Sequence, residues 1–244
     1  MKCYTILLIA IIFSSCNNSK LSSSDATNLK KIKATITIQN GTKKNSLDYI
    51  KVKLSDGKKQ IINKNIKVLL NNTPLELFVR QGNYYDKYAS YSTDDLVRKD
   101  SYYFEVILPD STRHPLAFIK PINKNRVAKF SISKSVSVND DFVLKWTNLN
   151  TPHQLDISKG LEIKKKRAAN ITEHTYHLRP TDTLKKRTGK YIVPKSYFTD
   201  SLTTINHLTV KITRKETGLT NPRFLKNSCI TYYHIIEKTL AFKE

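Results

Sequence analysis

Apolar and polar residues alternate strictly between positions 32 and 39 of this chain. Ile32, Ala34, Ile36 and Ile38 are each followed by one polar residue, and a period of two is the pattern of a β-strand with one buried face. The run ends at an Asn-Gly pair, which is typical of a turn. No segment keeps apolar residues at the i, i+3, i+4, i+7 spacing for three helical turns. The sequence therefore predicts an all-β protein.

Similar short runs recur along the chain, bounded by turn residues such as Asp56-Gly57, a pair that suits a tight hairpin. Many short strands with frequent turn signals favour a β-sandwich over a single closed barrel. The further strands expected are 47–54, 66–70, 75–79, 102–108 and 116–119 in the first half, and 127–132, 142–146, 154–157, 191–193, 207–213 and 230–238 in the second. A single helical turn is expected near 93–99.

The N-terminus has the pattern of a signal peptide. Lys2 precedes a nearly continuous apolar run from Tyr4 to Phe13, which is too short for a membrane-spanning helix of roughly 20 residues. Phe13-Ser14-Ser15-Cys16 resembles the lipobox of Gram-negative envelope lipoproteins. The resemblance implies that Cys16 is lipidated and becomes the new N-terminus, so that the protein is held on its membrane. The alternative is an ordinary secretory peptide that is cut elsewhere.

The residues after Cys16 bear on localisation. In such lipoproteins Asp directly after the cysteine retains the protein at the inner membrane, and this chain has Asn17 there. The resemblance therefore implies an outer-membrane lipoprotein. No acidic cluster follows in 17–20, which favours an orientation towards the periplasm over one on the cell surface.

Two further resemblances concern the folded modules. The first half, with Tyr84-Tyr85 and the stretch from Tyr102 to Asp110, resembles the immunoglobulin-like modules of envelope lipoproteins. The run 142–146 is similar to the tryptophan-bearing early strand of fibronectin type III domains. The second resemblance implies that Trp146 anchors a core, although the immunoglobulin-type cysteine pair is missing. Pro121 and the polar residues around it mark a domain boundary. The expected organisation is a signal peptide (1–15), a lipidated flexible tether (16–29) and two tandem immunoglobulin-like β-sandwich domains (30–122 and 127–244).

Charge is the strongest remaining signal, because 42 Lys and Arg face 20 Asp and Glu for a net charge of +22. The basic residues are densest in 164–190, where a segment of like charges should be exposed and attract anionic polymers. The candidate anion-binding residues are Lys164, Lys165, Lys166, Arg167, Arg179, Lys185, Lys186 and Arg187. A membrane-anchored chain meets anionic lipids and lipopolysaccharide first, so no nucleic-acid partner is expected. The alternative is an ordinary solvated surface.

Tyrosines crowd one polar segment. Tyr84, Tyr85, Tyr88 and Tyr91 lie among Gln, Asn and Asp, and exposed tyrosines could stack on sugar rings. Alternatively, they cover the core and hydrogen-bond the turns.

Catalytic and metal-binding motifs are weak. Neighbouring glycines are at least 16 positions apart, which excludes glycine-rich phosphate loops and the G-x-S-x-G elbow. His174 and His177 would point to opposite faces of a strand, while Asp94-Asp95 and 139–141 lack a calcium-loop pattern. Cys229 is expected to be a small buried side chain. No catalytic residue, metal or cofactor is assigned.

These observations favour a lipid-anchored, non-enzymatic envelope protein that presents β-sandwich surfaces to a protein partner or assembly. The alternative is a module that binds carbohydrate or an anionic polymer such as lipopolysaccharide. A hydrolase whose site is assembled in space is a less favoured third possibility.

Overall fold

The computed structural model describes residues 27–41, 48–81, 87–93, 99–121, 128–133, 135–164, 172–178, 181–198 and 203–243. Strands dominate these ranges, and the helical elements are short 3-10 turns such as η2 (Leu29–Lys31) and η4 (Lys195–Tyr197). The all-β prediction is confirmed. The predicted signal peptide, Cys16, most of the tether and the core of the helical turn expected near 93–99 lie outside the described residues.

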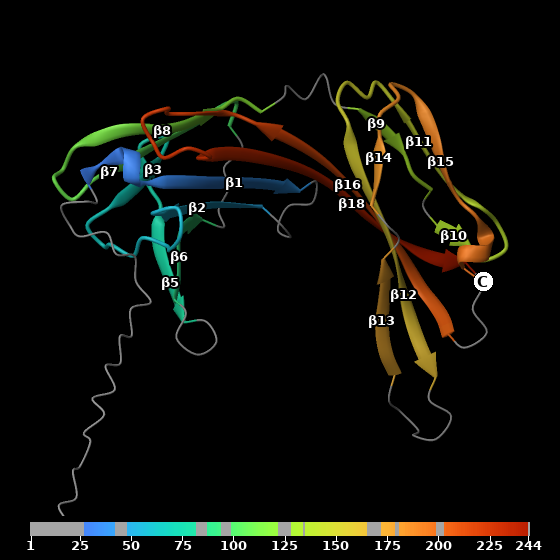
Figure 1. Cartoon of the computed structure of the whole chain (residues 1–244). Helices are drawn as coiled ribbons and strands as arrows, with labels where there is room; N and C mark the ends of the chain where they lie inside the picture. Colours follow the sequence, from blue (N-terminus) through green and yellow to red (C-terminus); the bar gives the residue numbers. More distant parts are fainter. Residues whose placement is uncertain are drawn as a thin grey trace, which may run out of the picture.

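One long sheet runs through the whole molecule (Figure 1). Its strands follow the order β13-β12-β16-β18-β1-β2-β6-β5, with β10 pairing with β18 and β14 pairing with β12 to make ten strands. The bounds are β1 (Lys33–Gly41), β2 (Tyr49–Ser55), β5 (Glu76–Gln81), β6 (Lys87–Thr93), β10 (Ser135–Ser137), β12 (His153–Lys164), β13 (Thr172–Leu178), β14 (Asp182–Leu184), β16 (Thr203–Thr217) and β18 (Cys229–Lys243).

Two smaller sheets pack on the long sheet. The five-stranded sheet has the order β17-β8-β7-β3-β4, and the three-stranded sheet has the order β15-β11-β9. Their bounds are β3 (Lys67–Leu70), β4 (Thr73–Pro74), β7 (Tyr102–Ile107), β8 (Arg113–Ile119), β9 (Lys129–Ser131), β11 (Phe142–Thr147), β15 (Gly189–Val193) and β17 (Leu219–Thr220). We call the five-stranded side the first lobe and the three-stranded side the second lobe. Figure 1 shows β16 and β18 running from one lobe to the other.

Both small sheets cover the same face of the long sheet. Along β18, Ile230 and Tyr232 belong to the buried cluster of the first lobe, while Leu240 belongs to that of the second. Residues an even number of positions apart share one face of a strand, so the two cores lie on one continuous face. The two sandwiches therefore share a sheet. The domain boundary expected between 122 and 127 falls on residues outside the described ranges and stays a prediction. The first core also contains residues from the C-terminal segment, namely Phe224, Ile230 and Tyr232.

The alternation read from the sequence is realised in the first lobe. Ala34, Ile36 and Ile38 of β1 are buried, and their neighbours are half-buried or more open. The turn between β3 and β4 uses Asn71 and Asn72 at φ of 46° and 69°. Asn tolerates this left-handed region better than most residues, and two such residues in succession fit a tight hairpin.

Trp146 anchors the second core, as the fibronectin resemblance implied. Its side chain is buried, and its Nε1–H donates to the carbonyl oxygen of Lys186 at 2.8 Å. The ring lies directly over Gly189, where an added Cβ would come within 2.5 Å of the indole. A glycine is required here because no larger side chain leaves room for the ring.

Polar side chains separate the two cores. His153, Arg214, Glu216 and His234 form what we call the waist, since Arg214 pairs in register with His153 on β12 and with His234 on β18. Arg214 and His153 are both buried. The shared face is therefore apolar at both ends and polar in the middle.

Cys229 is exposed, and the prediction that it is buried was wrong. It pairs with Thr35 on the open face of β1, whereas the next residue, Ile230, points into the core. The apolar run at the start of β18 did not show which of its alternate positions faces inward.

Candidate binding groove

A groove of about 300 Å³ lies over the first lobe, on the face of the long sheet that is turned away from the cores. It is formed over three neighbouring strands, β2, β6 and β5. We define the groove by its lining residues, which are Tyr49, Lys51, Lys53, Gln60, Phe78, Arg80, Tyr88, Ala89, Ser90 and Ser92.

Strand alternation places these side chains. On β2, Ile50, Val52 and Leu54 are buried in the first core. The intervening Tyr49, Lys51 and Lys53 consequently face the groove. Burial of the core positions thus fixes which side chains β2 offers to a ligand.

The groove opens where the ladder between β2 and β6 ends. These strands pair over three positions, from Ile50–Thr93 to Val52–Tyr91, whereas β5 and β6 pair over six. Beyond the shorter ladder, the backbone N–H of Ala89 donates to Oε1 of Gln60 at 2.6 Å. A side chain thus satisfies a donor that would otherwise bind a neighbouring strand.

Exposed rings and cations meet in the groove. The Tyr88 side chain is 55% exposed and Phe78 is 39% exposed, which is unusual for rings of this size. In register, Tyr88 pairs with Arg80, and Phe78 pairs with Ser90. Among the lining residues that the structure describes, three side chains are cationic and none is a carboxylate. Such a surface can stack on a flat ligand and bind a negative charge beside it.

The structure separates the tyrosines that were predicted to stack on glycans. Tyr88 lies in the groove, whereas Tyr91 is 3% exposed and belongs to the first core. The Tyr91 hydroxyl donates to the carbonyl oxygen of Ile66 at 2.9 Å, and burial raises the pKa of this phenol well above its ordinary value. Tyr91 cannot stack on a ligand, so its assignment to the site is corrected. Tyr84 and Tyr85 lie outside the described residues.

The structure places the ends of the predicted basic segment far apart. Lys164 pairs with Thr172 at one end of β12, while Leu184, just before Lys185, pairs with His153 at the other end. At about 3.3 Å per residue, these ends are roughly 35 Å apart. Lys185, Lys186 and Arg187 are exposed after β14, and Lys165, Lys166, Arg167 and Arg179 lie outside the described residues.

The described histidines and aspartates that were considered as metal ligands lie on a strand or next to a turn. His174 and His177 lie on β13, paired with Glu162 and Lys159 of β12. Oδ1 of Asp141 accepts a hydrogen bond from the backbone N–H of Lys195 at 2.8 Å. Among the residues that the structure describes, no group of three or more His, Cys, Asp or Glu side chains could hold a metal ion. Asp94 and Asp95 fall outside those residues.

A second exposed surface lies on the outer face of the five-stranded sheet. Tyr103, Phe118 and Leu219 form a row across β7, β8 and β17, since each pairs in register with the next. Leu219 is 75% exposed. We call these three residues the apolar row.

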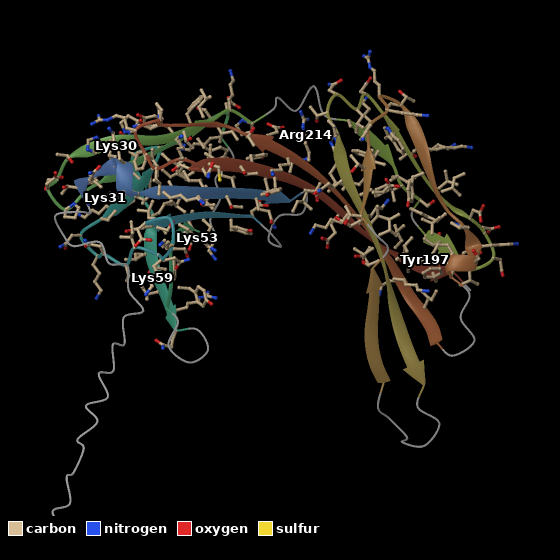
Figure 2. The ribbon with its side chains drawn as sticks, viewed as in Figure 1. Lys30, Lys31, Lys53, Lys59, Tyr197 and Arg214 are labelled. Carbon is tan, nitrogen blue, oxygen red and sulfur yellow. The ribbon has the colours of Figure 1, made fainter. Side chains whose placement is uncertain are left out.

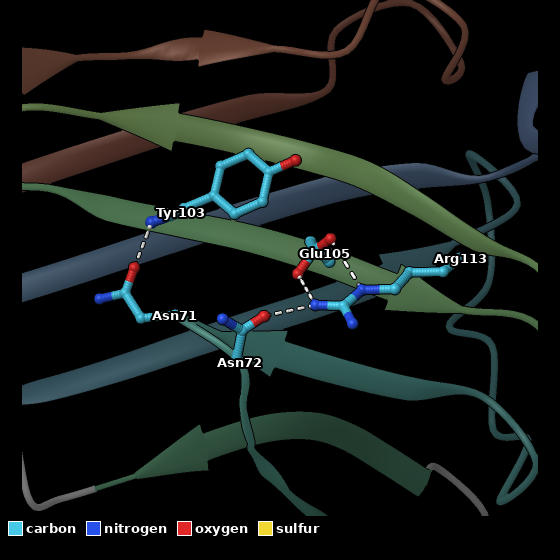
Figure 3. Close-up of polar contacts among 5 residues, drawn as sticks. All are labelled: Asn71, Asn72, Tyr103, Glu105 and Arg113. Carbon is cyan, nitrogen blue, oxygen red and sulfur yellow. Dashed lines mark hydrogen bonds and ion pairs between the residues drawn. The ribbon is translucent and has the colours of Figure 1, made fainter.

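Polar contacts hold the strands beside the apolar row (Figure 3). Nε of Arg113 donates to Oε1 of Glu105 at 2.8 Å, and the guanidinium also binds Asn72. The Glu105 carboxylate raises the pKa of Arg113 further, so this cation stays charged. The backbone N–H of Tyr103 donates to Oδ1 of Asn71 at 2.9 Å. The Asn71-Asn72 turn is thereby tied to the strand that carries Tyr103.

Sequence reasoning missed most of the groove. Tyr49, Lys51 and Lys53 stand at the outward positions of a strand that the pattern identified correctly. The signal present was an aromatic residue and two cations on one strand face. Only the strand order, with β6 inserted between β2 and β5, brings Phe78, Arg80 and Tyr88 to them.

The comparisons with known proteins give little more. No protein-family model matches the chain, and no curated protein matches its sequence. Among solved structures, the chain is similar to SGBP-B of the Bacteroides ovatus mixed-linkage glucan utilization locus, in complex with a mixed-linkage heptasaccharide. The identity is 12%, the TM-score is 0.24, and the match covers 95% of this chain and 47% of that one. The chain thus spans about half the length of that protein, and at this TM-score the likeness carries no functional argument.

Proposed function

We propose that this protein is a lipid-anchored protein of the bacterial envelope whose groove binds an acidic glycan. One observation carries the ligand class: exposed rings and three cations line a groove of about 300 Å³, and none of its described lining residues is a carboxylate. The proposed role is to hold the polymer, without cleaving it.

The chemistry of the groove matches a charged sugar. Tyr88 and Phe78 offer flat apolar surfaces against which the faces of sugar rings can pack. Lys51, Lys53 and Arg80 can pair with carboxylate, sulfate or phosphate groups, and a guanidinium can make two parallel hydrogen bonds to such a group. The hydroxyls of Ser90 and Ser92 can hydrogen-bond sugar hydroxyls. Stacking and charge would therefore act on the same ligand.

The anchor is proposed from the sequence. Lipidation of Cys16 would hold the chain on the outer membrane, because two or three acyl chains bind far more firmly than one. Within the described ranges, no helix is long and apolar enough to cross a membrane. Intact-mass analysis of the protein purified from membranes tests the anchor. We expect the mass of a chain that starts at Cys16 plus its acyl groups, and an unmodified chain would contradict the proposal.

Binding to defined polymers tests the groove. The mature chain from Asn17, which keeps both cores, should bind polygalacturonate more tightly than a neutral mixed-linkage glucan, and the preference should fall as salt rises. Tyr88→Ala and Arg80→Ala should each weaken binding to polygalacturonate about tenfold. Ile192→Ala is the matched control, because Ile192 is a similarly exposed apolar residue on the second lobe. Unchanged affinity in the Tyr88→Ala and Arg80→Ala double variant would refute the proposal.

A second candidate function rests on the apolar row. Exposed apolar residues that adjoin one another mark protein contacts more often than isolated ones do. Tyr103, Phe118 and Leu219 could therefore seat an envelope protein. A partner that the wild-type chain recovers from solubilised membranes, and that Leu219→Asp loses, would support this function. Recovery of that partner by both chains would exclude the apolar row as its contact.

A further inference from the structure

Exposed cations gather at the end of the first lobe where the described chain begins. We call this surface the basic end and define it by Lys30, Lys31, Lys58, Lys59, Arg223 and Lys226, all of which are exposed. They come from three segments that are distant in sequence. Figure 2 shows Lys30 and Lys31 at the end of the first lobe that is away from the second lobe, and Lys59 lower on the same lobe.

Direct contacts hold the three segments together. The backbone N–H of Leu225 donates to the carbonyl oxygen of Ile32 at 2.9 Å. The Leu225 side chain lies on Gly57, so closely that an added Cβ would be 3.1 Å from its Cδ2. Oγ of Ser228 accepts from the backbone N–H of Ala34 at 3.1 Å. The segments that carry the six cations are therefore packed together, and Lys30 and Arg223 line one hollow.

A hollow of about 470 Å³ opens on this surface, with Lys30 and Arg223 among its lining residues. Asp110, Thr112 and His114 line the same hollow. A hollow of this size with cationic side chains at its wall has room for a phosphate-bearing group.

Asp56, just before Lys58, and Asp110, which lines the hollow, both bind their own turns. Oδ1 of Asp56 accepts from the backbone N–H groups of Lys58 and Lys59 at 2.9 and 2.7 Å. Oδ1 of Asp110 accepts from the hydroxyl of Thr112 at 2.6 Å. With six cations and these two carboxylates, the surface has a net charge of about +4.

We propose that the basic end docks on the anionic phospholipid headgroups of the membrane that carries the protein, with Lys30 and Arg223 holding a headgroup phosphate in the hollow. The inference rests on the lipid anchor of the proposed function. Cys16 lies eleven residues before Thr27, so an extended tether reaches at most about 40 Å. The tether thus lets the basic end touch the bilayer, and within about 10 Å of an anionic surface each cation raises the affinity about fivefold.

Docking in this way would orient the molecule. β18 starts at Cys229, just after the basic end, and reaches Lys243 in the second lobe. At about 3.3 Å per residue, its far end lies roughly 45 Å from its start. The second lobe would therefore extend away from the bilayer.

Vesicle co-sedimentation tests the inference. The probe is the unlipidated mature chain from Asn17, with vesicles of phosphatidylcholine alone or with 30% phosphatidylglycerol. We expect binding only to the anionic vesicles, with affinity that falls as salt rises. The variant Lys30→Glu with Arg223→Glu should bind at least tenfold more weakly.

A matched charge reversal elsewhere shows whether vesicle binding depends on the basic end or only on the net charge of the protein. The control Lys185→Glu with Arg187→Glu alters the same charge on exposed residues of the second lobe, and its affinity should stay within twofold of the wild type. Equal losses in both variants, or no loss in either, would overturn the inference. Urea midpoints followed by circular dichroism, which reports on both lobes, show whether each variant is folded.

Failure of the groove is distinguishable from failure of the basic end. The Tyr88→Ala variant should keep its affinity for anionic vesicles and bind polygalacturonate more weakly. The Lys30→Glu and Arg223→Glu variant should show the reverse.

Discussion

Nε of Arg214 lies 2.9 Å from Oε1 of Glu216, two residues further along β16, at the waist between the two cores. The two side chains are only 5% and 14% exposed. The pair is held by charge rather than by a directed hydrogen bond from Nε. Burial lowers the pKa of Arg214, and the Glu216 carboxylate opposes that shift. The carboxylate thereby offsets the burial of a cation at the polar waist between the two apolar cores.

Removing one partner of this pair should lower the free energy of unfolding more than removing both partners. Arg214→Met leaves the Glu216 carboxylate buried without its cation, and we expect a loss of about 2–4 kcal/mol in the free energy of unfolding. The double variant Arg214→Met with Glu216→Leu should recover most of that loss, because two apolar side chains can pack together. Urea denaturation followed by circular dichroism measures both. A single variant as stable as the wild type would show that the ion pair contributes nothing.

His153 should make stability depend on pH. Burial lowers its pKa, the carbonyl oxygen of Thr151 at 2.8 Å opposes this, and the positive charge of Arg214 adds to the lowering. Between the ordinary value of about 6.5 and the lower value in the fold, the unfolded chain binds the proton first. The free energy of unfolding should thus fall as pH drops below about 6.5, by at most about 1.4 kcal/mol per pH unit.

The variant His153→Gln isolates this contribution. Urea midpoints measured from pH 7.5 to pH 5 should decline less steeply in the variant than in the wild type. Because the other five histidines remain in both proteins, the difference between the two curves belongs to His153. Parallel curves would contradict the prediction.

Gly189→Ala should loosen the second core. The new methyl group would come within 2.5 Å of the Trp146 ring, so the ring or the strand must move. We expect a loss of about 1–3 kcal/mol, as for other overpacked cores. Trp146 is the single tryptophan of the chain, so its fluorescence reports the change directly. Lys190→Ala, on the same strand but exposed, should leave both stability and fluorescence unchanged.

Two neighbouring tyrosines should respond in opposite ways. Tyr91→Phe loses the hydrogen bond to the carbonyl oxygen of Ile66 and should lower stability by about 1 kcal/mol while leaving glycan binding intact. Tyr88→Ala should weaken glycan binding while leaving stability within about 0.5 kcal/mol, because its side chain is mainly exposed. Thermal unfolding and polygalacturonate binding, measured on both variants, separate the two roles. A Tyr91→Phe variant that loses binding but not stability would reverse the assignment.

The strands themselves could be predicted because burial of one face leaves a periodic trace in the sequence. The alternation around Ile36 and around Val52 gave the inward positions of β1 and β2 correctly. Trp146 was also identified as a core residue, through the resemblance of the run from 142 to 146 to a fibronectin type III strand, and it is buried on β11 (Phe142–Thr147). In these cases the neighbours in sequence carry the information.

Sequence by itself determined the all-β class, strands such as those around Ile36, Val52 and Trp146, and a surface rich in lysine. Only the tertiary structure revealed strands such as β6 and β13 and decided which strands lie side by side. Pairing of β1 with β18 joins residues about 190 positions apart, and insertion of β6 between β2 and β5 assembles the groove. The pairing of β13 and β14 with β12 also divides the predicted basic segment between the two ends of β12. The physical reason is that a strand's own side chains report its burial, while its neighbours are chosen by backbone hydrogen bonds, which every residue type offers almost equally.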